Sequence, residues 1–406
     1  MSDYSQLALP PADPAFSRKA AIVGIGETDF HADYRAERAR APGYQPPSPE
    51  DLMKTAFDRA LADSGLTAGN IDGITVSFTY GGPSPEVAAQ LLGLKPRTMK
   101  TNGNIMAGPL PVVCADIANG EADTVAMVYM VSSRSIGRQY GGATYVGGQG
   151  GPSSYYYYHP WGWSSQAAHW AMIFRYYQGK FGAKEEDLGS VAVQVRRHAS
   201  VNPNAVMQTP ITIEDYMASR YIVRPMHLFD MCLVNDGAVC LIVRRSDMAR
   251  DLPHKPVLVA GWGEAINKHR KMECMVRDRL RPLLQQAGGE AFAMAGLGLG
   301  DVGHFEGYDA STMHLVNQVE GYGFAEPGEG LEFCKAGQMT IGGRLPTNMG
   351  GGNLSGSYMH GWSQVAEVVR QLRHEAVGRQ VPGVQVAMSS VAQTDQAHPI
   401  LYVRGE

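Results

Sequence analysis

Strand-like and helix-like segments alternate in both halves of the chain, and this restricts its fold more than any other sequence feature. In the first half, three apolar runs of strand length (20–26, 70–78 and 123–131) alternate with three helix-like segments (48–65, 86–94 and 107–119). The run at 123–131, DTVAMVYMV, has almost no polar residue, as expected of a strand covered on both faces. Strands alternating with helices over short connections predict a mostly parallel sheet flanked by helices.

The helix-like segment at 48–65 has clear ends. Ser48 can cap its first turn and Pro49 suits the first helical position. Gly65 follows the last apolar residue of the stripe and supplies the stop. The same alternation returns in the second half, with strand-like runs at 256–261, 301–308 and 385–390 and helix-like segments at 313–322 and 362–372. We therefore predict a weak internal duplication, with two α/β halves in place of two unlike domains.

The stretch between the halves, 132–224, has a different composition. It is Gly-rich at 141–154, and four tyrosines follow at 155–158. We expect a long irregular insertion, which in a compact α/β protein is usually a lid or binding loop. A packing arm or dimer-interface arm remains an equal alternative.

Composition excludes several function classes. Lys and Arg total 35 against 39 Asp and Glu, so the net charge is −4 and no basic field is available for general nucleic-acid binding. The N-terminal 18 residues lack the plan of a signal peptide, and no apolar run has membrane-spanning length. We expect a soluble cytoplasmic protein. Its five scattered cysteines form no zinc-binding spacing, so we expect buried reduced thiols and no metal site.

Four segments resemble, in order, motifs of the thiolase superfamily in its sterol-carrier-protein branch. They are TNGNIMAGPLPVVCADIANG at 101–120, RPMHLFDMCLVNDGAVCLIV at 224–243, FEGYDAST at 305–312 and GGRLPTNMGGGNLSGSYMHG at 342–361. Four ordered motifs spanning both halves are much more specific than any one of them. The resemblance implies the thiolase fold, in which two duplicated βαβαβ halves form a five-layer αβαβα arrangement with an inserted loop domain.

The resemblance also implies domain boundaries. The N-terminal half would comprise residues 19–131 and 225–250, the inserted loop or covering domain 132–224, and the C-terminal half 255–406.

This chain lacks the residues that thiolase chemistry requires. A thiolase needs a nucleophilic cysteine, a histidine that activates it and a second acid–base cysteine. Aligning the motifs places Ile105 at the nucleophile, and places Tyr308 and Tyr358 at two active-site histidines. The segment 391–399, VAQTDQAHP, lacks the second cysteine. Isoleucine cannot form an acyl-enzyme, so we predict that the protein is not a thiolase.

Tyrosines at both histidine positions resemble the aldolase branch of the superfamily, the steroid side-chain-cleaving enzymes once called lipid-transfer proteins. That resemblance implies retro-aldol cleavage of a bulky 3-hydroxyacyl-CoA to a ketone or aldehyde plus a short acyl-CoA, with a steroid side-chain thioester as substrate. Coenzyme A would be part of the substrate, and zinc would occur only in a partner. The family works with an OB-fold/zinc-ribbon protein of the hydratase type, so a homodimer core within a heterotetramer is expected.

Retro-aldol chemistry needs a base for the hydroxyl, stabilisation of the thioester enolate and an acid that protonates it. It needs no nucleophile, so the missing cysteine does not prevent it. Our hypothesis is that one of Tyr308 and Tyr358 is the base and the other the acid, with the assignment left open. Asp309 and His360 could tune them, although a structural role for each is equally consistent with the sequence.

An oxyanion or substrate site is predicted near the start of the helix at 107–119. Backbone N–H groups around Ile105 and Gly108 could hold the enolate oxygen. Gly352 and Asn353, in the glycine-rich motif, complete the candidate set.

Two other functions remain open. One is acyl-CoA C-acyl transfer by an unrecognised nucleophile, for which Cys114 is the nearby thiol but is poorly placed within a helix. The other is non-catalytic carriage of a lipid or acyl-CoA.

Overall fold

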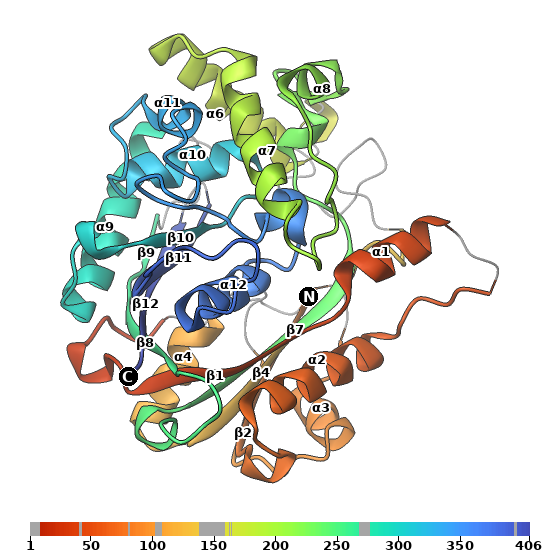
Figure 1. Ribbon diagram of the computed structural model, residues 1–406, viewed down its shortest axis with the longest axis vertical. Coiled ribbons are helices and arrows are strands. Elements are labelled where there is room, and N and C mark those ends of the chain that lie inside the picture. Colours follow the sequence, from red (N-terminus) through yellow and green to blue (C-terminus); the bar gives the residue numbers. More distant parts are fainter. Residues whose placement is uncertain are drawn as a thin grey trace.

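The computed structural model describes residues 9–39, 43–79, 82–101, 108–137, 159–161, 163, 165–267, 277–393 and 396–406. Its centre is a mixed sheet with the strand order β10-β11-β12-β8-β1-β7-β4-β2-β3, and β9 pairs with β12 (Figure 1). These strands are β1 Ala20–Glu27, β2 Gly73–Thr79, β3 Thr98–Thr101, β4 Thr124–Ser132, β7 Asp236–Arg245, β8 Val257–Trp262, β9 Ala265–Ile266, β10 His304–Gly307, β11 Val386–Ala392 and β12 Gln396–Arg404. A separate pair consists of β5 Tyr221–Val223 and β6 Met226–His227.

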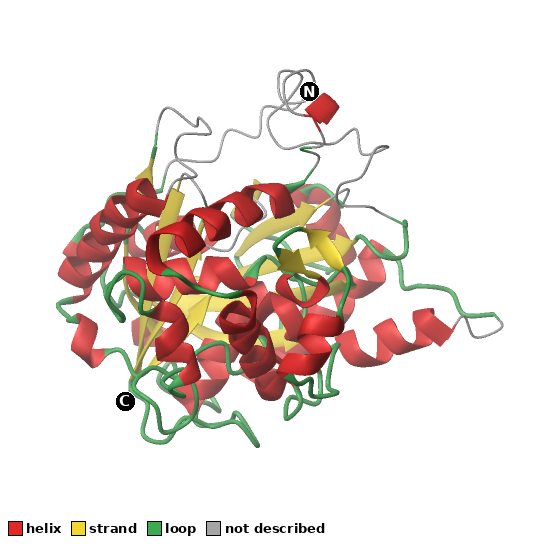
Figure 2. Ribbon diagram, turned by 90° about the horizontal axis from the view of Figure 1, so that it is seen from above, coloured by secondary structure: helices red, strands yellow, loops and turns green. Residues whose placement is uncertain are grey.

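The α-helices of the described residues lie on both faces of this sheet (Figure 2). They are α1 Phe30–Ala39, α2 Pro49–Ser64, α3 Pro85–Leu91, α4 Pro109–Ala118, α6 Gln166–Phe181, α7 Glu185–Ala199, α8 Ile213–Ala218, α9 Arg277–Ala295, α10 Thr312–Gly321, α11 Gly330–Lys335 and α12 Trp362–Arg373. No helix among the described residues is both long and apolar enough to cross a membrane.

The ends of α2 confirm the sequence prediction. The Ser48 hydroxyl accepts the backbone N–H of Asp51 at 3.1 Å, and the Asp51 carboxylate in turn accepts the N–H of Ser48. This reciprocal pair satisfies N–H groups that the first helical turn cannot. Gly65 ends the helix in the left-handed conformation, with φ of 70°.

The predicted duplication is confirmed by the strand order. In the first half, β7 runs antiparallel to both of its neighbours, β1 and β4, and β2 lies parallel to β4. In the second half, β8, β12, β11 and β10 repeat the same succession of orientations.

Each half also packs its first strand against its first long helix through a pair of glycines. A Cβ on Gly26 would lie 2.0 Å from the Ala56 carbonyl oxygen of α2. A Cβ on Gly263, just after β8, would lie 2.0 Å from the Ala287 carbonyl oxygen of α9. The two halves therefore share a close backbone contact that only glycine permits.

The prediction of a mostly parallel sheet was wrong. Only the β2–β3, β2–β4 and β10–β11 pairs are parallel, and the other paired strands are antiparallel. One cause is β12, which the sequence reading missed. It follows β11 after a few residues, and such a short connection forces the second strand to run back beside the first.

The layers are those of the implied five-layer arrangement. Helices α4 and α12 share one apolar core with strands of both halves, including Tyr129 and Val239 from the first and Ile400 and Tyr402 from the second. Helices α2 and α3 cover the outer face of the first half, and α9 and α10 cover that of the second (Figure 1). The loop that precedes α12 carries Tyr358 and His360 of the candidate site.

The insertion at 132–224 is less irregular than predicted. Its later part forms α6, α7 and α8, and the apolar faces of α6 and α7 join the core of the second half. Both helices bury residues at helical spacing, such as Leu188, Val191 and Val195 of α7, and the sequence interpretation overlooked this pattern. The Gly-rich run and Tyr155–Tyr158 lie outside the described residues.

Candidate active site

A chain of hydrogen bonds joins four ring side chains at the centre of the molecule. The hydroxyls of Tyr308 and Tyr358 lie 3.1 Å apart. The Tyr358 hydroxyl lies 2.8 Å from Nε2 of His360, and Nδ1 of the same imidazole hydrogen-bonds to the hydroxyl of Tyr129. Both predicted tyrosines and the predicted histidine are therefore brought together.

Tyr308 is held by the backbone of the strand that precedes it. It follows directly after β10, and its N–H donates to the Ser390 carbonyl of β11 at 2.8 Å. The Asn348 side chain forms two hydrogen bonds with Gly307, the residue before Tyr308. It accepts the Gly307 N–H at 2.8 Å and donates to the Gly307 carbonyl at 2.9 Å. With its backbone fixed on both sides, the buried Tyr308 ring has a defined position.

Tyr358 and His360 lie on the loop between the glycine-rich motif and α12. The Tyr358 N–H donates to Oδ1 of Asn235 at 2.8 Å, which connects this loop to the start of β7. His360 has a left-handed backbone, with φ of 48°, and Gly361 follows with φ of 89°. A non-glycine residue in this region is strained, and such strain persists where the surroundings enforce a functional geometry.

Burial disfavours the charged forms of Tyr358 and His360. Desolvation raises the pKa of the Tyr358 phenol well above its usual value, and the neighbouring Tyr308 raises it further. Desolvation lowers the pKa of His360 to about 3, so its imidazole carries one N–H and one acceptor nitrogen. A tyrosine can act as a base here only if its own proton has an acceptor within reach.

Asp309 is fully buried beside these four hydrogen-bonded rings. Among the described residues, only one of its two carboxyl oxygens accepts hydrogen bonds. Its Oδ1 accepts the Asn353 N–H at 2.7 Å, the Asn353 side-chain amide at 3.0 Å and the Gln364 amide at 3.3 Å. Asn353 thus points toward Asp309. Burial raises the pKa of Asp309 to about 8, so the group is mostly protonated near neutral pH.

The raised pKa of Asp309 predicts a pH-dependent stability. Between pH 4 and 8 the folded state holds a proton that the unfolded chain releases, so the free energy of unfolding falls as pH rises, by up to about 1.4 kcal/mol per pH unit. Asp309→Asn keeps the shape without the titration. We expect the stability difference between wild type and this variant to grow in favour of the variant from pH 5 to pH 7.5 in urea unfolding. A difference that does not change with pH would contradict the assignment.

A thiol also lies in this site, which the sequence reading missed. Cys232 packs against the small apolar cluster of Tyr308, Ala310 and Val391, next to Tyr358. It arrives there because its N–H donates to the Ala310 carbonyl at 3.1 Å. Cys114, the thiol considered from sequence, is buried in the core that α4 and α12 share with strands of both halves.

Cys232 is a poor nucleophile in this setting. Burial raises its pKa to about 12, and the nearby Asp309 contributes to the rise. The thiolate is the reactive form of a cysteine, and the raised pKa disfavours it at pH 7. The thiol therefore lines the site without being activated.

The predicted oxyanion region is described only in part. Ile105 lies outside the described residues, while Gly108 is half-buried at the start of α4. Pro109 and Pro111 have no N–H, so the first turn of α4 offers the N–H of Leu110 beside that of Gly108. Gly352 lies against Asp309, because a Cβ there would be 2.1 Å from Oδ2.

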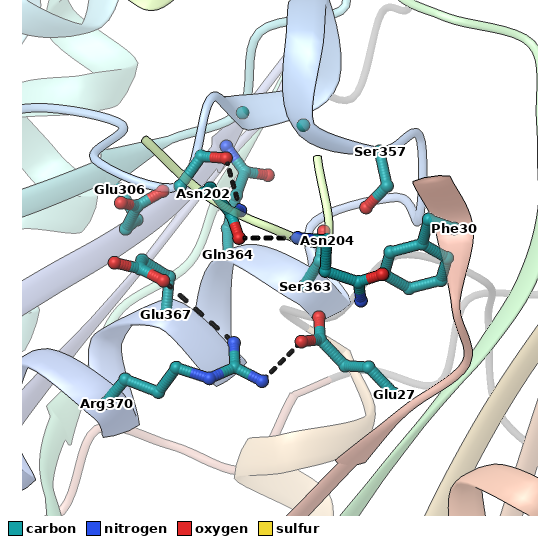
Figure 3. A pocket seen from close by; sticks show the side chains of 13 residues that line it. Glu27, Phe30, Asn202, Asn204, Glu306, Ser357, Ser363, Gln364, Glu367 and Arg370 are labelled. Atoms are coloured by element: carbon teal, nitrogen blue, oxygen red, sulfur yellow. Dashed lines mark hydrogen bonds and ion pairs between the residues drawn. The ribbon is translucent and has the colours of Figure 1, made fainter. Parts of the chain in front are cut away.

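Figure 3 shows a cavity lined mostly by polar side chains. It holds about 320 Å³ of free space including its open mouth, and Glu27, Glu306, Gln364, Glu367 and Arg370 are among its lining residues. Arg370 pairs with Glu27 at 2.5 Å and lies 3.9 Å from Glu367. Gln364 borders this cavity and also donates to Asp309, so the cavity adjoins the back of the site. The described residues contain no group of three His, Cys, Asp or Glu side chains that could hold a metal ion.

Sequence reasoning missed Tyr129, Cys232 and Gln364. Tyr129 lies within the apolar run of β4, where it reads as a core residue, and Gln364 reads as a polar residue of an amphipathic helix. Only the three-dimensional contacts show that these side chains serve the site. Asn235 lies within the motif at 224–243, and its bond to the Tyr358 N–H connects that motif to the site.

Known proteins share both the sequence and the fold. Residues 265–398 match the thiolase C-terminal domain-like family. The chain is 35% identical to the steroid side-chain-cleaving aldolase of Thermomonospora curvata, over 89% of this chain and 92% of that protein. It is 34% identical to the 17-hydroxy-3-oxo-4-pregnene-20-carboxyl-CoA lyase of Mycobacterium tuberculosis, over 91% and 95% of the two chains.

Among solved structures, the Ltp2-ChsH2(DUF35) aldolase superposes with a TM-score of 0.83 at 31% identity, covering 96% of this chain and 99% of that one. The human mitochondrial 3-ketoacyl-CoA thiolase, at 14% identity and a TM-score of 0.67, shares the fold. The chain is similar to these lyases over nearly their full length, and its architecture is that of the thiolases. The described part of the site contains no activated cysteine. These findings lead to one assignment. The chain belongs to the steroid side-chain-cleaving aldolases of the thiolase superfamily and is a carbon–carbon lyase.

Proposed function

We propose that this enzyme cleaves a bulky 3-hydroxyacyl-CoA, derived from a steroid side chain, by a retro-aldol reaction. The products are a ketone or aldehyde and a shorter acyl-CoA. The names of the aldolase and lyase relatives support the substrate class. The observation that carries the chemistry is the hydroxyl–hydroxyl contact of 3.1 Å between Tyr308 and Tyr358, with His360 behind it.

In the proposed reaction Tyr358 is the base and Tyr308 the acid. Tyr358 takes the proton of the substrate hydroxyl while its own proton moves toward Nε2 of His360, 2.8 Å away. The Cα–Cβ bond then breaks, leaving a carbonyl product and the thioester enolate, and Tyr308 protonates the enolate carbon. The contact between the two phenols lets the proton return to Tyr308, so one proton moves from oxygen to carbon overall.

The enolate oxygen is proposed to lie near the N–H groups of Gly108 and Leu110, with the backbone around Ile105. Asp309, held by Asn353 beside Gly352, is proposed to keep the loop before Tyr358 in place. We propose that the reaction needs no cofactor besides the coenzyme A of the substrate.

Acyl transfer is the second candidate, because Cys232 contacts the site. The raised pKa of the Cys232 thiol argues against acyl transfer. We predict that Cys232→Ala retains cleavage within about threefold of wild type, since retro-aldol chemistry uses no nucleophile. Cys114→Ala is the matched control for loss of a buried thiol. Loss of all activity in a folded Cys232→Ala enzyme would revive acyl transfer.

We also propose the assembly that the relatives suggest. A solved relative is named as a complex with a DUF35 chain, and we propose an OB-fold/zinc-ribbon partner of that kind here. Strand β3 is an edge of the sheet and exposes Met99, while Val87 and Leu91 of α3 are exposed beside it. This edge suits pairing of two copies into a homodimer core. We also propose that the two halves and the insertion at 132–224 are separate domains.

Product analysis tests the function. The chain with its hydratase-type partner would be incubated with a steroid 3-hydroxyacyl-CoA, and carbonyl and acyl-CoA products would be measured by mass spectrometry. We expect equal amounts of both, without free coenzyme A being consumed. Tight binding without any product would favour a carrier.

A further inference from the structure

Tyr129 is the one member of the hydrogen-bonded chain that has no part in the proposed reaction. Its side chain is fully buried on β4, and its hydroxyl bonds to Nδ1 of His360. Its ring stacks on Trp362 at 5.5 Å with an interplanar angle of 20°, and meets the His360 ring edge-on at 5.7 Å. These contacts fix the phenol against the imidazole from a rigid central strand.

A neutral imidazole carries its single proton on one nitrogen or the other. If the proton is on Nε2, that nitrogen donates to Tyr358 and cannot accept the Tyr358 proton. If it is on Nδ1, Nε2 is free to accept. Tyr358 can therefore act as a base through His360 only in the Nδ1–H tautomer.

We propose that Tyr129 is a positioning residue that accepts the Nδ1–H of His360 and so holds Nε2 as the proton acceptor for Tyr358. This inference rests on the proposed function, because it assumes that Tyr358 is the base. The arrangement parallels a serine hydrolase triad, in which a buried acceptor sets the tautomer of the catalytic imidazole. Here a neutral phenol takes the place of a carboxylate.

The proton transfers balance. The substrate hydroxyl proton moves to the Tyr358 oxygen as the Tyr358 proton moves to Nε2, which gives an imidazolium opposite the forming enolate. Nδ1–H keeps its bond to the Tyr129 oxygen throughout. After Tyr308 protonates the enolate carbon, the Nε2 proton moves to Tyr358, and the Tyr358 proton passes to Tyr308.

The first test is the tautomer of His360 in the resting enzyme. The full chain, labelled with ¹⁵N-histidine, would be studied by NMR, with the His360 resonances identified from their loss in His360→Gln. We expect Nδ1 protonated and Nε2 unprotonated in wild type. In Tyr129→Phe, which keeps the ring stacked on Trp362, we expect a mixture of the two tautomers. An Nε2–H tautomer in wild type, or an unchanged tautomer in Tyr129→Phe, would overturn the proposal.

The second test is kinetic. Tyr129→Phe should lower kcat by about 10- to 100-fold with KM unchanged, as expected for loss of a hydrogen bond to a group that becomes charged. Tyr402→Phe is the matched control, since Tyr402 lies in the same core and its hydroxyl bonds to Ser389 at 2.9 Å. We expect Tyr402→Phe to retain wild-type kcat. Equal losses in both variants would indicate a general packing effect and contradict the positioning role.

The outcomes separate this inference from the proposed function. If wild type gave no carbonyl product, the proposed function would fail whatever the tautomer, and if Tyr308→Phe and Tyr358→Phe left cleavage intact, the acid–base roles of the two tyrosines would fail. If those variants lost cleavage while His360 held the Nε2–H tautomer, cleavage by the two phenols would stand, while the role of Tyr129 and the proton transfer from Tyr358 to His360 would fail together. The wild-type NMR measurement needs no folded variant of Tyr129, so the test stands even if Tyr129→Phe does not fold.

Discussion

Replacing Tyr358 or Tyr308 by phenylalanine is expected to slow cleavage by about 100-fold or more, the usual cost of losing a general acid or base. Each substitution removes one hydroxyl of the pair that lies 3.1 Å apart and leaves the ring in place. The Tyr358→Phe enzyme would have no group between the substrate and His360. Steady-state release of the carbonyl product is the measurement.

The matched control is Tyr322→Phe. Tyr322 is also a buried phenol of the second half, and its hydroxyl bonds to Ser390 at 2.5 Å, outside the chain of four rings. We expect this variant to cleave at close to the wild-type rate. Wild-type rates in both Tyr308→Phe and Tyr358→Phe would remove the site assignment.

The second large effect is expected from Gly352→Ala. Gly352 has φ of 52°, and an added Cβ would lie 2.1 Å from Oδ2 of Asp309 and 2.7 Å from Nδ2 of Asn348. Left-handed strain and overpacking together should cost about 3 kcal/mol of unfolding free energy. Cleavage should also fall sharply, because Asn348 holds the backbone just before Tyr308.

Gly342→Ala separates strain from overpacking. Gly342 also has a positive φ, of 87°, but an added Cβ there would meet nothing within 4 Å. We expect it to cost about 1 kcal/mol, from strain alone, and to leave cleavage unchanged. Urea unfolding of both variants gives the comparison. If the two alanines destabilised the enzyme equally, the contact with Asp309 would not be the cause.

Much of the fold could be predicted from the sequence, because the residues that define many helices and strands lie within those elements or at their ends. Ser48 and Gly65 delimit α2 through their own side chain and backbone, and the apolar run of β4 needs no partner to be recognised. The direction of the strands was mispredicted, because it depends on how the connections between strands run. Strand β12 is set by its short connection to β11, and the pattern of its residues does not reveal that direction.

The sequence also predicted some residues of the site and missed others. The motif alignment located Tyr308 and Tyr358, and their positions 50 residues apart in the chain are joined by a contact of 3.1 Å. Tyr129 and Cys232 could not be found this way. Tyr129 looks like any core residue of a buried strand, and Cys232 reaches the site through a backbone bond to Ala310 that no local pattern encodes.

The proposed reaction cleaves a carbon–carbon bond without a covalent intermediate, although a thiol borders the two phenols. The most direct measurement is intact-protein mass spectrometry of the enzyme, with its partner, quenched during turnover of a 3-hydroxyacyl-CoA. We predict that the chain keeps its unmodified mass while carbonyl product accumulates. An added acyl mass that maps to Cys232 and decays with turnover would contradict the account.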